Sequence, residues 1–504
     1  MISKRKVLLF VSSFVILIGF VASFLMAERR SCMSVPIISE EKIRDYVEVS
    51  TLDISQLTFN GEAIAIDLLN NSIYISQSSE NLDNVHMFQG KLATTNSEYS
   101  LYFLETQEMQ DVSLTVREGN PFKLIIKQGE TYQRVNLVIT TLPILYLDLE
   151  ATNKTEDGRD LMNGKLTLWD NFDPNSEHYK VSTSDVEWHV RGNSTKIFDK
   201  LSWKVNLKKE NGENNNLDLL GLGSDDDWIL NAMSMDDTKV KEKIAQELWN
   251  QLKENTDYNY KMSSGKYAEL FINGAYQGLY LLQRRVDEKY LEIDRERDIL
   301  LKGRNTWEAE YIEDAYEIVS SPLAKDYSYK VVEKTQNFLN DTMNIRNFID
   351  VSLFLQFLSA HDNSGYKNMF YVLKKTDEIY EIYLVPWDTD LSLGATWTYD
   401  YEDSIDDIIE RRELEIVRKY MPEIDRELAI RWESLRKSIF AEQNIYEICE
   451  HATRELAISG AVERNKERWG ELNEGEDNWE NLKFYIKERL EFLDNYYVQF
   501  IEEE

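Results

Sequence analysis

The stretch NFIDVSLFLQFLSAHDN, residues 347–363, joins a long apolar segment to a polar end. Because its first part is apolar on nearly every side, it predicts a helix that is buried on most of its faces. Such a helix delivers Asp362 out of the core at its C-terminal end. Asn368 follows within the same loop, and Asp388 closes the next apolar run. The pattern fits a phosphoryl-transfer centre, and it also fits an ordinary polar loop.

The segments NMFYVLKK and EIYEIYLVPW come next and predict a hairpin, with Asn368 near the end of one strand and Asp388 near the end of the other. Phosphoryl transfer requires positioned metal ions, cations on the phosphates and a carboxylate that orients the acceptor hydroxyl. In that interpretation Asp362 faces the acceptor. Asn368 and Asp388, with Asp390 as a further carboxylate, supply hard oxygen ligands to a divalent metal. Asp and Asn are also common in loops because they satisfy local backbone groups, so the pattern alone does not decide.

Length and composition restrict the class of protein. A chain of 504 residues is too long for one simple core and predicts two or three folding units. The formal charge of -33 argues against nucleic acid as a partner. Two cysteines, Cys32 and Cys449, exclude a disulfide framework and a cysteine-based zinc site. The five histidines are scattered and show no metal-ligand spacing.

The N-terminus predicts a signal anchor over residues 1–30. A basic start precedes an apolar run, residues 7–26, and about 20 apolar residues are what a bilayer-spanning helix needs. Positive charge before the run favours an inside N-terminus and an outside globular part, although Arg29 and Arg30 after it weaken the asymmetry. We therefore expect a single-pass protein of the cell membrane, attached through this helix.

The remaining chain divides into three regions. Residues 37–141 alternate between apolar and polar and predict a small antiparallel β domain without chemistry of its own. Residues 142–404 mix strand and helix signals, including the turn Asn273-Gly274 between apolar strands. Residues 405–504 are helical and highly charged, with apolar packing stripes.

Several segments of the middle region, taken in order, carry a resemblance to a known family. They are VRGNSTKIFDKLSWKVNLKK, WILNAMSMDDTKVKEKIAQEL, LFINGAYQGLYLL, LLKGRN, NMFYVLKK and VPWDTDLSLG. Together they resemble the spore-coat-H (CotH) kinase family, from about residue 142 to the C-terminal helices. The resemblance implies an α+β fold with an atypical kinase-like domain, which uses ATP and a divalent metal, Mg or Mn, to phosphorylate proteins on serine.

The resemblance also implies roles for individual residues. Asp362 resembles the catalytic aspartate of the family. Asp388 resembles the metal-binding aspartate, with Asp390 as the second acidic position of that motif, and Asn368 matches the asparagine before the aromatic strand. Lys204 matches a basic strand position suited to the nucleotide phosphates, with a solvated strand lysine as the alternative.

Four further positions are less simple. Arg191 heads the RGNS turn and is assigned to nucleotide binding with Lys204. Gly274 and Gly278 allow close approach to a phosphate, but forming the hairpin and its twist is the preferred explanation. Arg284 stands where the family usually shows an acidic or amide residue. If that side chain orients a lysine or a metal in the family, an arginine at this position is expected to disturb it.

The expected function is therefore a membrane-anchored, extracytoplasmic protein kinase that acts on a surface or spore-coat protein. Two alternatives remain open. One is a non-catalytic assembly module on a kinase-like scaffold, displayed at the cell or spore surface. The other is a metal-dependent phosphohydrolase that uses the same carboxylates with water as the acceptor.

Overall fold

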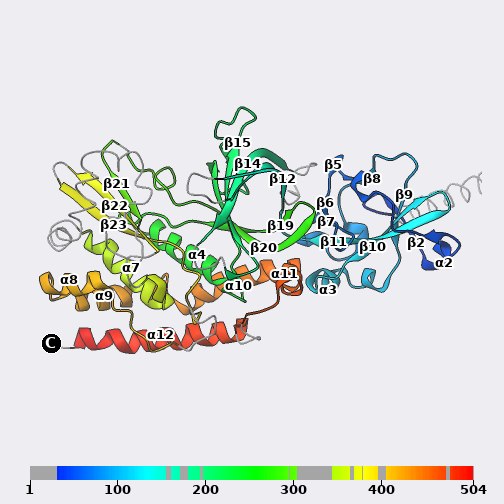
Figure 1. Cartoon of the computed structure of the whole chain (residues 1–504). Helices are drawn as coiled ribbons and strands as arrows, with labels where there is room; N and C mark the ends of the chain where they lie inside the picture. Colours follow the sequence, from blue (N-terminus) through cyan, green and yellow to red (C-terminus); the bar gives the residue numbers. More distant parts are fainter. Residues whose placement is uncertain are drawn as a thin grey trace, which may run out of the picture.

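The computed structural model describes residues 31–154, 160–170, 180–192, 197–294, 296–302, 343–363, 368–376, 379–395, 404–472 and 477–502. The expected anchor at residues 1–30 lies outside these ranges. Within them, no helix is both long and apolar enough to cross a membrane. The architecture is mixed α+β, as expected, with sheets first and helices gathered towards the C-terminus (Figure 1).

The N-terminal part is built around a sheet of strand order β1-β2-β9-β10-β11-β7-β6, with β3 beside β11. Its strands are β1 (Ser31–Cys32), β2 (Val35–Ile38), β3 (Val47–Glu48), β6 (Ala65–Asp67), β7 (Ser72–Ser76), β9 (Ser100–Leu104), β10 (Phe122–Gln128) and β11 (Thr131–Thr140). A smaller sheet contains β5 (Glu62–Ala63), β4 (Leu57–Phe59) and β8 (Leu92–Thr94). The short helices here are α2 (Glu40–Ile43) and α3 (Val112–Arg117).

The direction of these strands corrects the expectation of an antiparallel domain. Strands β9, β10 and β11 pair antiparallel, but β2–β9, β3–β11 and β7–β11 are parallel pairs. Alternation of apolar and polar residues shows that a strand has two different faces, whichever way its neighbour runs. Strand direction depends on the connections, because parallel neighbours need a long crossover that a local pattern does not report.

The middle part of the chain closes into a barrel of order β12-β13-β14-β15-β18-β20-β19. The strands are β12 (Ile144–Lys154), β13 (Asp160–Trp169), β14 (Val181–Arg191), β15 (Ser202–Lys208), β18 (Asp227–Asn231), β19 (Gly265–Ile272) and β20 (Ala275–Arg284). Parallel pairing of β12 with β19 completes the ring. A short ribbon of β16 (Leu217–Asp218) and β17 (Ser224–Asp225) precedes β18.

Side chains fill the inside of this barrel. Trp188, Trp228 and Tyr280 are buried there together with leucines and valines from the neighbouring strands. Gly164 faces the bulge of β12, where an added Cβ would lie 1.7 Å from the carbonyl oxygen of Asp148, so no larger residue fits. The barrel is therefore a packed core, and ligands must bind on its outer face or at its ends.

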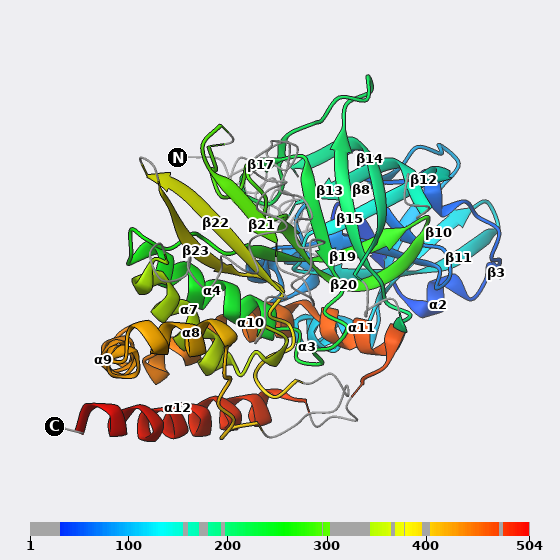
Figure 2. The same cartoon turned by 60° about the vertical axis from the view of Figure 1, so that its left-hand side comes forward.

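Helices and a second sheet follow the barrel. The sheet has the order β21 (Ile299–Lys302), β22 (Met369–Thr376) and β23 (Ile379–Pro386). The helices are α4 (Lys241–Glu254), α7 (Ile345–Leu358), α8 (Arg412–Tyr420), α9 (Ile424–Arg436), α10 (Glu442–Ser459), α11 (Ala461–Trp469) and α12 (Trp479–Glu502). Every residue of α7 from Asn347 to Leu358 is buried, as its composition predicts. Figures 1 and 2 show α12 lying along the outside of α9 and α10.

The N-terminal part packs directly on the barrel. The rings of Tyr74 and Tyr276 stack with centroids 5.2 Å apart, and the backbone N–H of Leu68 donates to the carbonyl of Gly274 at 2.8 Å. Gly278 packs against α11, since an added Cβ would lie 2.5 Å from an oxygen of Asn465. Both hairpin glycines therefore serve turn geometry and packing, which agrees with the preferred explanation for them.

Candidate active site

The first element of the site is the end of α7. Ser359 caps the helix in the left-handed conformation, with φ of 50°, and a short 3-10 turn, His361–Asn363, follows it. Asp362 lies in this turn and is partly buried. The buried helix thus fixes where the chain leaves the core, and it places Asp362 at the margin of the core as the sequence predicts.

Hydrogen bonds join Asp362 to the other predicted residues. The Asn368 side-chain amide donates to Asp362 Oδ2 at 2.6 Å and to the backbone carbonyl of Asp388 at 3.3 Å. Asn363 braces the same loops, because its amide donates to the carbonyls of Asn368 and Trp387, each at 2.9 Å. The structure therefore brings Asp362, Asn368 and Asp388 together.

Two of these residues have an unusual backbone. Asn368 and Asp388 have positive φ angles of 57° and 55°. Left-handed backbone at a residue other than glycine costs on the order of 1 kcal/mol or more, and it persists only where the surroundings hold it. Such conformations gather at functional sites, and here both occur at the ends of the hairpin strands that carry the predicted ligands.

Repulsion among carboxylates marks the same place. Burial raises the pKa of Asp390 well above its ordinary range, and the negative charges of Asp388, Glu242 and Asp362 raise it further. The nearby charge of Arg191 acts in the opposite direction but does not cancel the rise. An excess of carboxylates in one place favours binding of a cation.

Glu242 was not singled out from the sequence. It lies in the first turn of α4, is 1% exposed, and accepts from the backbone N–H and the hydroxyl of Thr389, each at 2.8 Å. Thr389 stands between Asp388 and Asp390, so Glu242 contacts the predicted metal loop from behind. A single glutamate inside a charged helix start gives no sequence signal of this contact.

Arg191 lies where it was expected. Its Nη2 is 3.3 Å from Asp388 Oδ1, and its guanidinium carbon is 5.0 Å from the centroid of the Trp387 ring. Lys302, at the end of β21, lies against the same ring, with its Nζ 6.0 Å from the centroid. Two cations from different sheets therefore flank the residue before Asp388. Lys302 lies within the segment LLKGRN, and no role was predicted for it from the sequence.

Lys204 lies in β15, next to the strand β14 that carries Arg191. Lys204 is the cross-strand partner of Ile229 in β18, and Ile229 is in turn the cross-strand partner of Gln283 in β20. The side chain of Ile229 belongs to the same buried hydrophobic cluster as Trp387. The ammonium of Lys204 lies 3.7 Å from Asp227 Oδ1. Lys204 is therefore near the site in the fold, and its ammonium lies close to a carboxylate of the barrel itself, that of Asp227 in β18.

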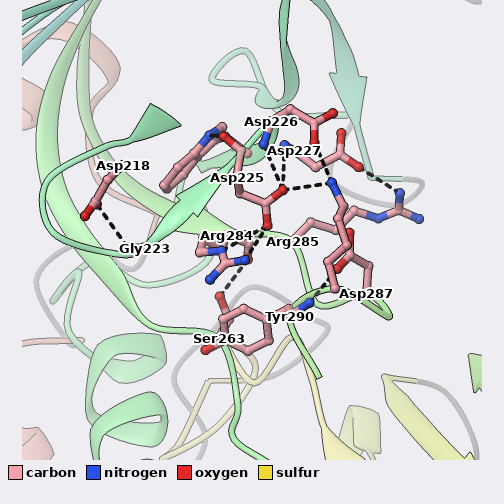
Figure 3. Close-up of polar contacts among 12 residues, drawn as sticks. Asp218, Gly223, Asp225, Asp226, Asp227, Ser263, Arg284, Arg285, Asp287 and Tyr290 are labelled. Carbon is pink, nitrogen blue, oxygen red and sulfur yellow. Dashed lines mark hydrogen bonds and ion pairs between the residues drawn. The ribbon is translucent and has the colours of Figure 1, made fainter. Parts of the chain in front are cut away.

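Arg284 lies away from the site, and the expectation that it disturbs a lysine or a metal there finds no support in its contacts. Its guanidinium donates to Asp225 Oδ2 at 3.0 and 2.6 Å and lies over the ring of Tyr290 (Figure 3). The preceding residue, Gln283, is the one whose side chain reaches α4, where it accepts from Gln246 at 2.7 Å. Because successive strand residues face opposite sides, one position of offset separates these roles.

The donor set suits magnesium or manganese only in part. Among the described residues, no three His, Cys, Asp or Glu side chains already form a group able to hold a metal. Mg²⁺ at ATP sites, however, usually takes one or two carboxylates from the protein and the rest of its ligands from phosphate and water. Asp388 and Asp390, which repel each other, together with the side-chain oxygen of Asn368, fit that requirement chemically.

Comparison with known proteins agrees with this geometry. The profile of a family described as CotH kinase protein matches residues 188–493, more than half of the chain. The match begins within β14, later than the expected start near residue 142, although β12 and β13 are needed to close the barrel. No curated protein matches the chain. The chain belongs to the CotH kinase protein family.

Proposed function

We propose that the protein is an atypical protein kinase that transfers the γ-phosphoryl group of ATP to a protein hydroxyl, mainly that of serine. The reaction would use Mg²⁺ or Mn²⁺. The observation that carries the proposal is the hydrogen-bonded unit of Asp362, Asn368 and Asp388 at the end of α7. Membership of the CotH kinase family supports the same reaction class.

Each residue has a chemical task in this proposal. Asp362 accepts the proton of the acceptor hydroxyl or orients it, and the Asn368 amide holds its Oδ2 in place. Arg191 and Lys302, flanking Trp387, provide positive charge for the phosphates. Asp388, Asp390 and Asn368 would hold the divalent ion, which would supply positive charge against the phosphates of the nucleotide.

The setting of the reaction is part of the proposal. The N-terminal apolar run anchors the protein in the cell membrane, with the folded part outside the cytoplasm, and a surface or spore-coat protein is the substrate. ATP is scarce outside a cell, so this orientation requires a source such as a mother-cell compartment. Protease accessibility on intact cells tests the orientation: protection of the folded part would contradict an outside location.

A non-catalytic assembly module is the second candidate, and one contact favours it. The ammonium of Lys204 lies 3.7 Å from Asp227 Oδ1, so an acid of the barrel already balances part of its charge. In that case the carboxylates form a scaffold and no nucleotide is used. A thermal-shift titration with ATP and Mn²⁺ separates the two candidates, because a scaffold without a nucleotide site shows no shift and is indifferent to Asp388→Ala.

The decisive experiment is phosphate transfer by the purified full chain. Labelled ATP with Mn²⁺ or Mg²⁺ should give incorporation into the protein itself or an added acceptor, and Asp362→Asn should abolish it. ATP hydrolysis that is unchanged by an acceptor would indicate a phosphohydrolase instead. Nucleotide binding without any turnover would overturn the catalytic proposal.

A further inference from the structure

Glu242 accepts three hydrogen bonds, and two of them come from one residue, Thr389, of the loop that follows β23, residues 387–391 (the Asp388 loop). Its Oε2 accepts the backbone N–H and the hydroxyl of Thr389, each at 2.8 Å. Its Oε1 accepts from the Gln246 amide at 3.0 Å. A carboxylate with both oxygens accepting hydrogen bonds is held in one orientation.

The contact continues beyond Glu242. The amide of Gln246 also donates to Gln283 Oε1 at 2.7 Å, and all three side chains are about 1% exposed. A buried polar chain therefore runs from β20 of the barrel, through the first turns of α4, to Thr389. Gln246 Oε1 is the one atom of these three side chains that is buried without a hydrogen-bond partner, and the hydrogen bonds of the others hold the chain in one arrangement.

The Asp388 loop needs such a restraint. Asp388 has a φ of 55°, which is unfavourable for a residue with a Cβ. This strain pushes the loop towards other conformations unless the surroundings hold it. Thr389 lies between Asp388 and Asp390, so two hydrogen bonds on Thr389 act directly on the strained peptide.

Burying a carboxyl group in this place is expensive, which argues that its hydrogen bonds to Thr389 have a role beyond packing α4. Burial raises the pKa of Glu242, and repulsion from Asp388 raises it further. The start of α4 offsets part of the cost, because a helix N-terminus favours negative charge in its first turn. An apolar residue would pack α4 without the desolvation penalty, but it would leave the donors of Thr389 unpaired.

We propose that Glu242 is a positioning residue that fixes Thr389, and through it Asp388 and Asp390, in the geometry that receives a divalent cation. The link from β20 then couples the barrel to the metal loop. The cation part of this inference rests on the proposed kinase function, whereas the positioning of the loop does not.

The first test measures the loop without metal or nucleotide. Amide hydrogen exchange of the segment containing Thr389 should be at least tenfold faster in Glu242→Met, in the full chain well below its melting temperature. Asp477→Asn is the matched control, since Asp477, two residues before α12, is also a buried acid that contacts the first turn of α4, but it pairs with Lys241 there at 2.7 Å and not with Thr389. It should leave exchange at Thr389 within twofold. Unchanged exchange in folded Glu242→Met overturns the proposal.

Two milder variants protect the test against a failure to fold. Thr389→Val removes only the hydroxyl donor and should speed exchange of the neighbouring amides about threefold. Glu242→Gln removes the charge but keeps the size of the side chain and an oxygen that can accept from Thr389. The Thr389 amide should therefore retain most of its protection against hydrogen exchange. Exchange as slow in Thr389→Val as in the parent chain, with Glu242→Met unfolded, also counts against the proposal.

The second test measures Mn²⁺ binding by titration calorimetry. The dissociation constant should rise at least tenfold in Glu242→Met and at least threefold in Glu242→Gln, with no change in Asp477→Asn. A purely structural role lowers the melting temperature and leaves Mn²⁺ affinity alone. If the parent chain neither binds Mn²⁺ nor transfers phosphate, the proposed function fails, and the exchange result still decides the positioning of the loop.

Discussion

Two clusters of charged residues lie at the barrel, and they differ in how their charges are balanced. The Asp225 cluster joins three acids to three bases: Asp225, Asp226, Asp227, Arg284, Arg285 and Lys289 (Figure 3). The Asp388 site brings the negative side chains Asp362, Asp388, Asp390 and Glu242 close to the positive side chain of Arg191. One cluster is internally neutral, and the other has an excess of negative charge.

The pKa values of the acids follow this difference. Burial raises the pKa of Asp225, but hydrogen bonds from Arg284 and Lys289 outweigh it and leave the pKa below its ordinary value. For Asp390 burial and neighbouring carboxylates act together, and the pKa lies well above its ordinary value. The Asp225 cluster thus balances its charges within the fold, whereas the Asp388 site has unbalanced carboxylates, which is the charge distribution that the proposed divalent cation requires.

The largest effect is expected where the site itself is altered. Asp388→Asn should lower phosphate transfer about 1,000-fold, equivalent to about 4 kcal/mol of transition-state stabilisation, because a ligand oxygen loses its charge. Its melting temperature should not fall, since one repelling carboxylate is removed. Transfer rates and thermal unfolding of the same preparations measure both. Activity within tenfold of the parent would place the metal elsewhere.

Breaking the neutral cluster should have the opposite profile. Arg284→Met leaves buried Asp225 with Lys289 alone, and removing one partner of a buried pair costs about 3 kcal/mol. The rate of transfer per folded molecule should be unchanged. Arg134→Met is the control, because it breaks an exposed pair with Glu40 and should cost less than about 1 kcal/mol in denaturant unfolding. A loss of activity in folded Arg284→Met would join the two clusters functionally.

Lys204 lies beside the neutral cluster, at Asp227, and its substitution tests whether it also serves the Asp388 site. Lys204→Met should weaken ATP binding about tenfold, or about 1.4 kcal/mol, if the ammonium leaves Asp227 for a phosphate. Lys208→Met is matched, since Lys208 lies on the same strand and pairs with Glu187 at 3.6 Å. Equal ATP affinity in the two variants, measured by calorimetry, would make Lys204 an ordinary strand lysine.

The smallest effect concerns stability and pH. The folded-state pKa of Asp390 is raised above 3.8, so the folded protein binds more protons and its stability falls as pH rises through the window above 3.8. Without metal, Asp390→Asn should therefore stabilise the protein near neutral pH. The gain should vanish near pH 3, where the carboxyl is protonated in both states. Denaturant unfolding with a chelator at both pH values measures it, and a loss of stability near neutral pH would contradict it.

Local patterns predicted much of the fold correctly. The apolar composition of α7 predicted its burial, and the Asn273-Gly274 turn predicted the hairpin of β19 and β20, with φ of 51° and 73°. The stripe of Leu428, Trp432 and Leu435 is buried in α9 as expected. These succeed because burial on one face and turn geometry are properties of a few neighbouring residues.

Long-range pairing was outside the reach of such patterns. The parallel strands of the N-terminal sheet and the β12–β19 pair that closes the barrel join segments far apart in sequence. Contacts of the same kind decide the roles of Arg284 and Glu242. Arg284 meets Asp225 at a separation of 59 residues, and Glu242 meets Thr389 at a separation of 147. Neither partner is marked by any local signal.

The sequence by itself determined the α+β class, the buried helix, and the order of motifs that brings Asp362, Asn368 and Asp388 to one end of a helix and a hairpin. Their geometry follows from the chain because these three residues are near one another in sequence. The tertiary structure alone decided how charge is distributed around them: Glu242 behind the loop, Arg191 and Lys302 on Trp387, Lys204 on Asp227. Electrostatic balance depends on distances between distant segments, and only the folded chain sets those distances.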